Sequence, residues 1–334
     1  MELPSELPAI TEKSGKKWER NPDPAIQIAS EALHKLIQKP QRLLDLEDSA
    51  MSSREGVYIL PRWERYKIEA LGQRRGGQDL LPRGSSAHNV SFCTAALRTP
   101  QGTTIDLVVA VKTFSQSASA INDASINAIA LQREILTSDP IAVIVEGRKD
   151  IGDKKAEPEK KRGFIVAKAR KDIQALDTEP WHQFQTGSPE VKAYFAHRLM
   201  QISQSLADLH SAGITHGDPQ VKNFWAVNTG EVEPFDWESA KISSSTFEPE
   251  QTAEIALSDL ETLFRSLTNQ IDTSPIPAIQ GPVKSQWEQF KQLILDPYED
   301  ELLNRLGKNE LQADQIIDSI DELERNLMAR LNIR

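Results

Sequence analysis

Residues 206–238 read LADLHSAGITHGDPQVKNFWAVNTGEVEPFDWE and carry the clearest structural signal in the chain. A helical spacing of apolar residues leads into a loop that holds Asp218 and, five residues later, Asn223. Two short apolar runs follow, and residues 228–230 (Asn-Thr-Gly) between them predict a hairpin, because Asn and Gly tolerate positive φ. Asp236 comes directly after the second run. The order helix, loop, hairpin, loop would therefore bring oxygen-bearing side chains to the ends of neighbouring rigid elements.

This arrangement resembles the catalytic and metal-binding loops of the protein-kinase-like superfamily. The superfamily includes eukaryotic-type protein kinases and small-molecule phosphotransferases of the aminoglycoside and lipopolysaccharide-sugar type. Its pattern of His-x-Asp, four residues, Asn, a hairpin and a final Asp matches His216, Asp218, Asn223 and Asp236. The resemblance implies an α+β, bilobal protein-kinase-like fold, in which a small antiparallel β lobe with one helix joins a larger, mainly helical lobe. It also implies a kinase that uses ATP and Mg²⁺, with Asp218 as catalytic base and Asn223 and Asp236 as metal ligands.

The strand-like run Val109-Ala110-Val111-Lys112 resembles the third-strand lysine motif of kinases. Side chains alternate along a strand, so Ala110 and Lys112 should share one face. The resemblance implies that Lys112 contacts the ATP phosphates and that Ala110 leaves room for the adenine. A helix predicted over residues 123–137, with Asp123 as its N-cap, offers Glu134 as the ion-pair partner that holds the lysine in place.

The phosphate-covering loop is the weakest match to the family. Residues 71–77 keep glycines at both ends of the family pattern but have an arginine in the middle, whereas residues 83–89 have one glycine among small residues. We favour Gly84, Ser85 and Ser86, because they lie directly before the strand expected to pair toward the lysine. Neither loop has the three glycines that let a backbone approach phosphate closely, which leaves open that neither of them cradles phosphate tightly.

Three further positions follow from the resemblance. The strand predicted over residues 163–169 should lead into the hinge between the lobes, where backbone groups at Ala167 and Ala169 would meet the adenine. Lys222, next to the metal-binding asparagine, is either a contact to the transferred phosphate or a surface lysine.

Composition limits the classes of function that the chain can serve. The 334 residues carry a formal net charge of −10, which argues against nucleic-acid binding. A single cysteine, Cys93, excludes an internal disulfide and suits a reducing cytoplasm. No apolar run approaches the length of about 20 residues that spans a bilayer. We expect an N-terminal, partly helical extension over residues 1–56, a small lobe over 57–170 and a large lobe over 171–334.

Two outlying helices have structural and interaction readings. Asp23-Pro24 predicts the start of a helix up to residue 37, which either packs on the small lobe or binds a regulatory partner. A last helix over residues 310–332 carries an apolar stripe that packs on its own domain or forms a partner face. In a helix over residues 255–267, the resemblance makes Asp259 the buried residue that holds the catalytic loop.

The acceptor of the phosphate has two readings. Gly217 stands where regulated protein kinases have arginine, and Trp237-Glu238 follows the metal aspartate in place of Phe-Gly, which favours a small-molecule phosphotransferase. The lysine strand and the stretch before His216 favour a protein kinase. Transfer to a hydroxyl, with Ser or Thr of a protein as the favoured acceptor, is therefore the main hypothesis. A small-molecule kinase, a pseudokinase that acts as a nucleotide-binding scaffold, and a protein without kinase function are the alternatives.

Overall fold

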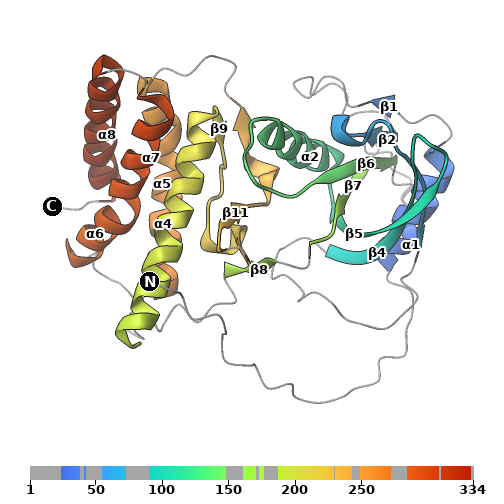
Figure 1. Cartoon of the computed structure of the whole chain (residues 1–334), viewed down its shortest axis with the longest axis horizontal. Helices are drawn as coiled ribbons and strands as arrows, with labels where there is room; N and C mark the ends of the chain where they lie inside the picture. The colour runs from blue at the N-terminus through green and yellow to red at the C-terminus, as the bar shows by residue number, and fades with distance from the viewer. Residues whose placement is uncertain are drawn as a thin grey trace, which may run out of the picture.

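The structure is a computed structural model of the chain, and it has two lobes that lie side by side (Figure 1). Helices dominate one lobe, and a curled sheet with two helices makes up the other. The residues that the structure describes are 24–37, 41–42, 55–72, 90–147, 161–170, 173–176, 187–228, 230–242, 249–271, 284–307 and 310–331.

The small lobe is built on a seven-stranded sheet of order β1-β2-β6-β7-β5-β4-β3. Its strands are β1 (Gln41–Arg42), β2 (Gly56–Ile59), β3 (Lys67–Gly72), β4 (Val90–Arg98), β5 (Thr104–Phe114), β6 (Pro140–Gly147) and β7 (Lys161–Lys168). Among these described strands the β1–β2 pair is parallel and every other pairing is antiparallel. The 3₁₀ turn η2 (Pro61–Trp63) joins β2 to β3.

Helices cover both faces of this sheet. Helix α1 (Pro24–Leu36) buries Ala29 and Leu33 against one face, together with Val109 and Val111 of β5. Helix α2 (Ser117–Gln132) packs on the other face, to which Phe114 of β5 also contributes. The predicted N-terminal helix is therefore confirmed as a packing element of the small lobe. Because side chains alternate along β5, Lys112 lies on the face that α2 covers.

The large lobe surrounds a three-stranded and a two-stranded sheet with long helices. Its strands are β8 (Ile173–Ala175), β9 (Ile214–Thr215), β10 (Phe224–Val227), β11 (Val232–Pro234) and β12 (Lys241–Ile242), with short 3₁₀ turns η4 (Val221–Asn223) and η5 (Trp237–Ser239). Its helices are α4 (Pro189–Ser211), α5 (Pro249–Ile271), α6 (Lys284–Phe290), α7 (Asp296–Leu306) and α8 (Glu310–Arg330), and the π-helical segment η6 (Lys291–Leu295) joins α6 to α7.

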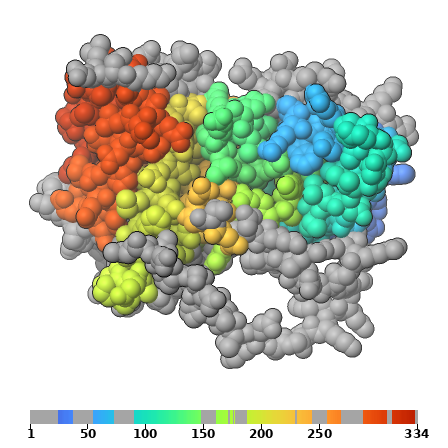
Figure 2. All heavy atoms as spheres, in the orientation of Figure 1, coloured from blue at the N-terminus to red at the C-terminus, as the bar shows by residue number. Residues whose placement is uncertain are grey.

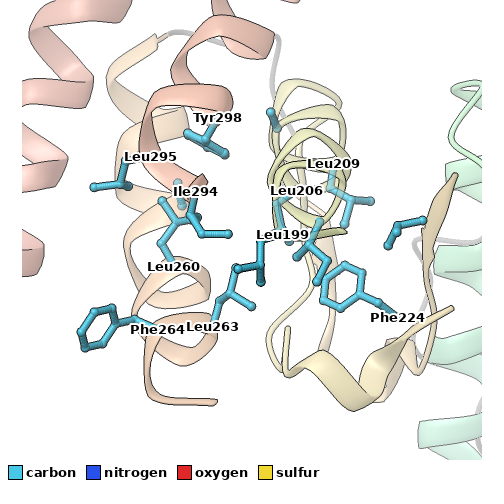
Figure 3. Close-up of a cluster of buried hydrophobic side chains, with 14 of the residues drawn as sticks. Leu199, Leu206, Leu209, Phe224, Leu260, Leu263, Phe264, Ile294, Leu295 and Tyr298 are labelled. Atoms are coloured by element: carbon cyan, nitrogen blue, oxygen red, sulfur yellow. The ribbon is translucent and has the colours of Figure 1, made fainter. Parts of the chain in front are cut away.

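A single apolar core holds these helices together. Leucines of α4 interleave with Leu260 and Leu263 of α5 and with Ile294 and Tyr298 near the start of α7 (Figure 3). The apolar stripe of α8 is buried in the same core, so its prediction as a packing stripe of its own domain is confirmed. Helix α7 is an additional helix that the sequence did not predict. Together the lobes form the α+β, bilobal architecture expected from the sequence.

None of the helices in the described parts of the chain is both long enough and apolar enough to cross a membrane.

Candidate active site

The two lobes meet at the amine of Lys112 on β5. Its Nζ lies 2.6 Å from Oδ1 of Asp236, two residues after β11 in the large lobe, and 2.7 Å from Oδ2 of Asp123 on α2. The ring of Phe114 lies below the same amine, with its centroid 4.7 Å away. Burial would lower the pKa of Lys112, but the two carboxylates outweigh burial and raise this pKa above its ordinary value. The amine therefore stays charged, and it links side chains from β5, α2 and the loop after β11.

The partner of the lysine on α2 is Asp123, and the prediction of Glu134 is wrong. The helix starts at Ser117, so Asp123 lies within it and does not cap it. It ends at Gln132, and Glu134 sits in the following turn at φ 63°, exposed to solvent. Nothing in the residues around Asp123, which include the polar Asn122 and Ser125, marks it in the sequence as the partner of the lysine.

The loop between β9 and β10 fixes the carboxylate of Asp218. Its Oδ1 accepts from Nε2 of Gln220 at 2.7 Å, and its Oδ2 accepts from Nδ2 of Asn223 at 3.0 Å. The same amide nitrogen donates to the Asp218 carbonyl at 2.8 Å. Gln220 therefore orients this carboxylate, a role that sequence reasoning missed although the residue stands two positions after the aspartate.

The donor set at the ends of β10 and β11 fits a hard divalent cation such as Mg²⁺. Phe235 N donates to the Asn223 carbonyl at 3.0 Å, so Asn223 and Asp236 stand at adjacent strand ends. The side-chain nitrogen of Asn223 faces Asp218, which leaves Oδ1 as the atom able to ligate, and Asp236 adds a carboxylate. The described residues hold no group of three or more His, Cys, Asp or Glu suited to a metal. A cation here would therefore depend on the asparagine.

Asp236 has an uncommon backbone conformation. Its φ of 69° and ψ of 65° lie in the left-handed region, where non-glycine residues other than Asn and Asp are rare. The adjacent Trp237 is fully buried and stacks on His216, with ring centroids 5.1 Å apart. This packing on Trp237 holds the backbone beside Asp236, so the carboxylate stays aimed at Lys112.

A buried carboxylate on α5 supports the catalytic loop from below. Asp259 accepts from the backbone N–H of His216 at 2.7 Å and of Gly217 at 2.9 Å, and its Oδ2 lies 3.0 Å from Nε2 of His210. On the other side of that ring, Tyr298 Oη lies 2.7 Å from Nδ1. Burial would raise the pKa of Asp259, but its hydrogen bond and charge interaction with His210, helped by His216, hold this pKa below its usual value. The contacts agree with the structural role expected of Asp259.

His216 is a packed ring. It is fully buried between the rings of Trp237 and Phe224, and neither of its nitrogens has a hydrogen-bond partner among the described residues. Burial lowers its pKa against the opposing effect of nearby carboxylates, so the ring is neutral. Such a ring supports the loop by packing.

An apolar surface lies beside the lysine on the same face of the sheet. Ala110 pairs with Phe92 on β4 and with Ala167 on β7, so the three side chains form one row across the strands. Phe92 remains 37% exposed, which is unusual for a large apolar side chain on a face that a helix partly covers. In the large lobe, Trp225 and Phe235 stack with centroids 4.2 Å apart next to Asp236. Sequence reasoning singled out neither Phe92 nor Trp225.

Some of the backbone groups expected to contact adenine at the hinge already form hydrogen bonds within the small lobe. The N–H of Ala169 donates to the Val108 carbonyl at 3.0 Å, and that of Lys168 donates to Asp139 at 2.9 Å. The N–H of Ala169 is therefore already bonded within the lobe, while an adenine contact at Ala167 or at the Ala169 carbonyl stays a prediction.

Two of the predicted positions are less defined by the structure. Lys222 is half-buried in η4, next to Asn223, and its contact to a phosphate stays a prediction. Gly84, Ser85 and Ser86 lie outside the described residues, as does most of the competing glycine-containing loop.

Comparisons with known proteins were made for the whole chain. No protein-family model and no curated protein sequence matches it. Among solved structures, one described as WaaP in complex with acyl carrier protein is 16% identical, with 69% of this chain and 85% of that chain covered and a TM-score of 0.37. The kinase domain of a Toxoplasma gondii rhoptry antigen is 14% identical, with 94% and 100% covered and a TM-score of 0.35.

Proposed function

We propose that the protein is an ATP-dependent phosphotransferase that moves the γ-phosphate of Mg²⁺-ATP to a hydroxyl group. The observation that carries the proposal is the meeting of the Lys112 amine with Asp236 at 2.6 Å, which joins a small-lobe cation to a large-lobe carboxylate. Asp218 and Asn223 lie in the loop before the hairpin that ends at Asp236. Phosphoryl transfer needs alignment and charge neutralisation more than covalent chemistry, and these residue types supply both.

Lys112 has the role of neutralising phosphate oxygens. Its charge is maintained by Asp123 and Asp236, and Asp123 is itself held by a 2.9 Å hydrogen bond from Asn127. When a nucleotide binds, Asp123 would keep the Lys112 amine at the edge of the site. The carboxylate of Asp236 would then be available to bind Mg²⁺. Mg²⁺ bound by Asn223 and Asp236 would neutralise the charge of the phosphates.

Asp218 has the role of orienting the acceptor and taking its proton. The acceptor oxygen forms a bond to the γ-phosphorus, the bond from this phosphorus to the β,γ-bridging oxygen breaks, and ADP leaves. The proton of the hydroxyl passes to a carboxylate oxygen of Asp218. The hydrogen bonds from Gln220 and Asn223 hold that carboxylate still before the reaction, which lowers the cost of alignment.

The adenine would lie between apolar surfaces of the two lobes. Phe92, Ala110 and Ala167 form the small-lobe side, and the stacked pair of Trp225 and Phe235 is the aromatic surface of the large lobe next to the metal-binding end of the hairpin. Flat rings stack well on such surfaces. We keep Gly84, Ser85 and Ser86 as the proposed cover of the phosphates.

For the acceptor, we favour a Ser or Thr of a protein, with a small amino- or sugar-containing molecule as the alternative. The single, buried cysteine suits a reducing compartment, and we place the activity in the cytoplasm.

The test is transfer of the label from γ-labelled ATP with Mg²⁺, measured on a mixture of protein acceptors and on aminoglycoside and sugar acceptors. Wild type should label one of the two classes. Asp218→Asn, which keeps the shape of the side chain but not the base, should lower the rate about 100-fold. Lys112→Met should lower it by a similar factor, because it removes a phosphate contact. Equal rates of transfer and of ATP hydrolysis in all three proteins would contradict the proposal. ATP binding without transfer to any acceptor would support a scaffold.

A further inference from the structure

Helix α2 and the loop after β11 are joined by a second set of contacts, besides the one through Lys112. Asn122 Nδ2 lies 3.1 Å from each of the carbonyls of Trp237, Glu238 and Ala240. Figure 2 shows the green atoms of α2 lying against the yellow atoms of the large lobe. Although α2 belongs to the small lobe in sequence, it is attached to the backbone that carries Asp236.

A buried hydroxyl stands at the centre of this junction. Thr137 Oγ1 lies 2.8 Å from Asn127 Oδ1 and 3.0 Å from the Pro234 carbonyl, either of which can accept its proton. It accepts in turn from Nε1 of Trp237 at 3.1 Å. Thr137 is 5% exposed and Asn127 is 1% exposed, so water is a poor substitute for these partners.

Together with the ion pairs of Lys112, these bonds form a closed ring of contacts that includes the lysine. Asn127 Nδ2 holds Oδ1 of Asp123 at 2.9 Å, and the other oxygen of Asp123 holds Lys112. We call this set of contacts the clamp ring. Its members, in order, are Lys112, Asp123, Asn127, Thr137, Trp237 and Asp236. Asp236 precedes Trp237 in the chain, and its ion pair with Lys112 closes the ring.

We propose that Thr137 is a positioning residue of the phosphotransferase site, because its hydroxyl couples the two carboxylates that grip Lys112. On one side it fixes Asp123 through Asn127, and on the other it fixes the left-handed backbone of Asp236 through Trp237. The ring holds α2 and the metal-binding loop in one arrangement, so Lys112 and Asp236 are aligned before a nucleotide arrives. This inference rests on the proposed function for its kinetic consequence and on the contacts alone for its structural one.

The kinetic test compares two substitutions at one position. Thr137→Val keeps the shape of the side chain but removes the hydroxyl, whereas Thr137→Ser restores it. Thr137→Val should lower kcat and raise the Mg²⁺ concentration for half-maximal rate, each by about fivefold or more, because it removes both the donated and the accepted hydrogen bond and one lost buried hydrogen bond already gives about that factor. Thr137→Ser should return both towards wild type. A merely structural role would reduce the amount of active protein but not shift the Mg²⁺ concentration, so an unshifted value would overturn the proposal.

A matched control lies on helix α2. Ser125 is 3% exposed, and its hydroxyl has no hydrogen-bond partner among the described residues. Ser125→Ala also removes a buried hydroxyl but leaves the clamp ring intact, so its kinetics should equal those of wild type. If Thr137→Val does not fold, Trp237→Phe removes the hydrogen bond that Trp237 donates to Thr137 and should shift both values in the same direction. Wild-type kinetics in Trp237→Phe would overturn the proposal.

A spectroscopic readout separates this inference from the proposed function. The ammonium signal of Lys112 in nitrogen-15 NMR, assigned by its loss in Lys112→Met, should be sharp in wild type, Thr137→Ser and Ser125→Ala. In Thr137→Val it should shift or broaden, although the substituted side chain does not touch the lysine. If wild type transfers no phosphate, the proposed function fails, and this signal then decides the matter: a change supports the ring, and an unchanged signal overturns it.

Discussion

Gly217 is the residue at which backbone geometry limits the chain most tightly. Its φ is 78°, its N–H donates to Asp259, and a Cβ built on it would lie 2.2 Å from the carbonyl oxygen of Ser239. The segment after Asp236 therefore packs directly on the backbone of the catalytic loop. An arginine at this position, as in regulated protein kinases, has no space here, which agrees with a site that does not wait for an activating phosphate.

Gly217→Ala should lower the free energy of unfolding by about 2 kcal/mol or more, because strain at positive φ adds to the clash. Gly102 provides the control, since its φ is 84° but nothing lies within 4 Å of a built Cβ. Gly102→Ala should cost about 1 kcal/mol, the strain alone. Urea denaturation of both variants measures the difference, and equal losses would show that the contact with Ser239 has no weight.

Among the individual residues, the spacing of three of them along the sequence predicted part of the site. The positions of Asp218, Asn223 and Asp236 relative to a helix and a hairpin led to their placement, because short loops between rigid elements leave little freedom. Lys112 was found by the resemblance of residues 109–112 to the lysine strand of kinases, and strand alternation placed it on one face with Ala110. The acidic partner of Lys112 was not found. Asp123 lies 11 residues after the lysine, and whether it reaches the amine depends on where the helix begins. The capping preferences of the residues did not predict that start.

Helix α2 shows why that start was misplaced. Its N-cap is Gln116, which makes no side-chain capping hydrogen bond, whereas Asp123 is a good cap by type. Tertiary contacts of the buried face set the start of the helix and outweighed this local preference. Helix α7 was missed for a related reason: Pro297 lies in its first turn, where proline is tolerated, and the π-helical turn η6 carries the chain from α6 into it without a break.

A carboxylate with a raised pKa, Asp208, lies where α4 contacts α7. Burial raises the pKa of Asp208 to about 6, against the opposing charge of Arg305, whose Nη2 lies 2.8 Å from it, and the nearby Glu301 adds to the rise. In the unfolded chain the pKa of Asp208 is near its ordinary value. As pH rises, the unfolded state therefore loses this proton before the folded state does. Asp208 therefore lowers stability progressively above about pH 4, and the loss is complete above about pH 6.

Asp208→Asn should remove this loss. Its free energy of unfolding should match that of wild type near pH 4 and exceed it by about 1 kcal/mol at pH 7, after allowance for solvent screening of a partly exposed group. Thermal or urea unfolding across this pH range measures the gap. A gap that does not change with pH would contradict the assignment of the shifted pKa to Asp208.

For the whole molecule, the fold class followed from one ordered string of motifs, while the way the lobes join did not. We propose the division into residues 57–170 and 171–334, which separates the lobes near Arg170. This residue pairs with the buried carboxylate of Glu233 on β11, so the connection between the lobes is itself held by a salt bridge. A boundary at residue 56 would separate α1 from the sheet on which it packs, so α1 is part of the small lobe in structure.

The central claim is that side chains from both lobes form one site for a metal-bound nucleotide. Its most direct test is calorimetric titration of ATP, with and without Mg²⁺, into wild type and Asp236→Asn, a substitution that keeps the shape and tolerates the left-handed backbone. Mg²⁺ should tighten ATP binding to wild type by about tenfold or more and leave the affinity of Asp236→Asn unchanged. Absence of ATP binding to wild type, or an equal effect of Mg²⁺ on both proteins, would contradict the account.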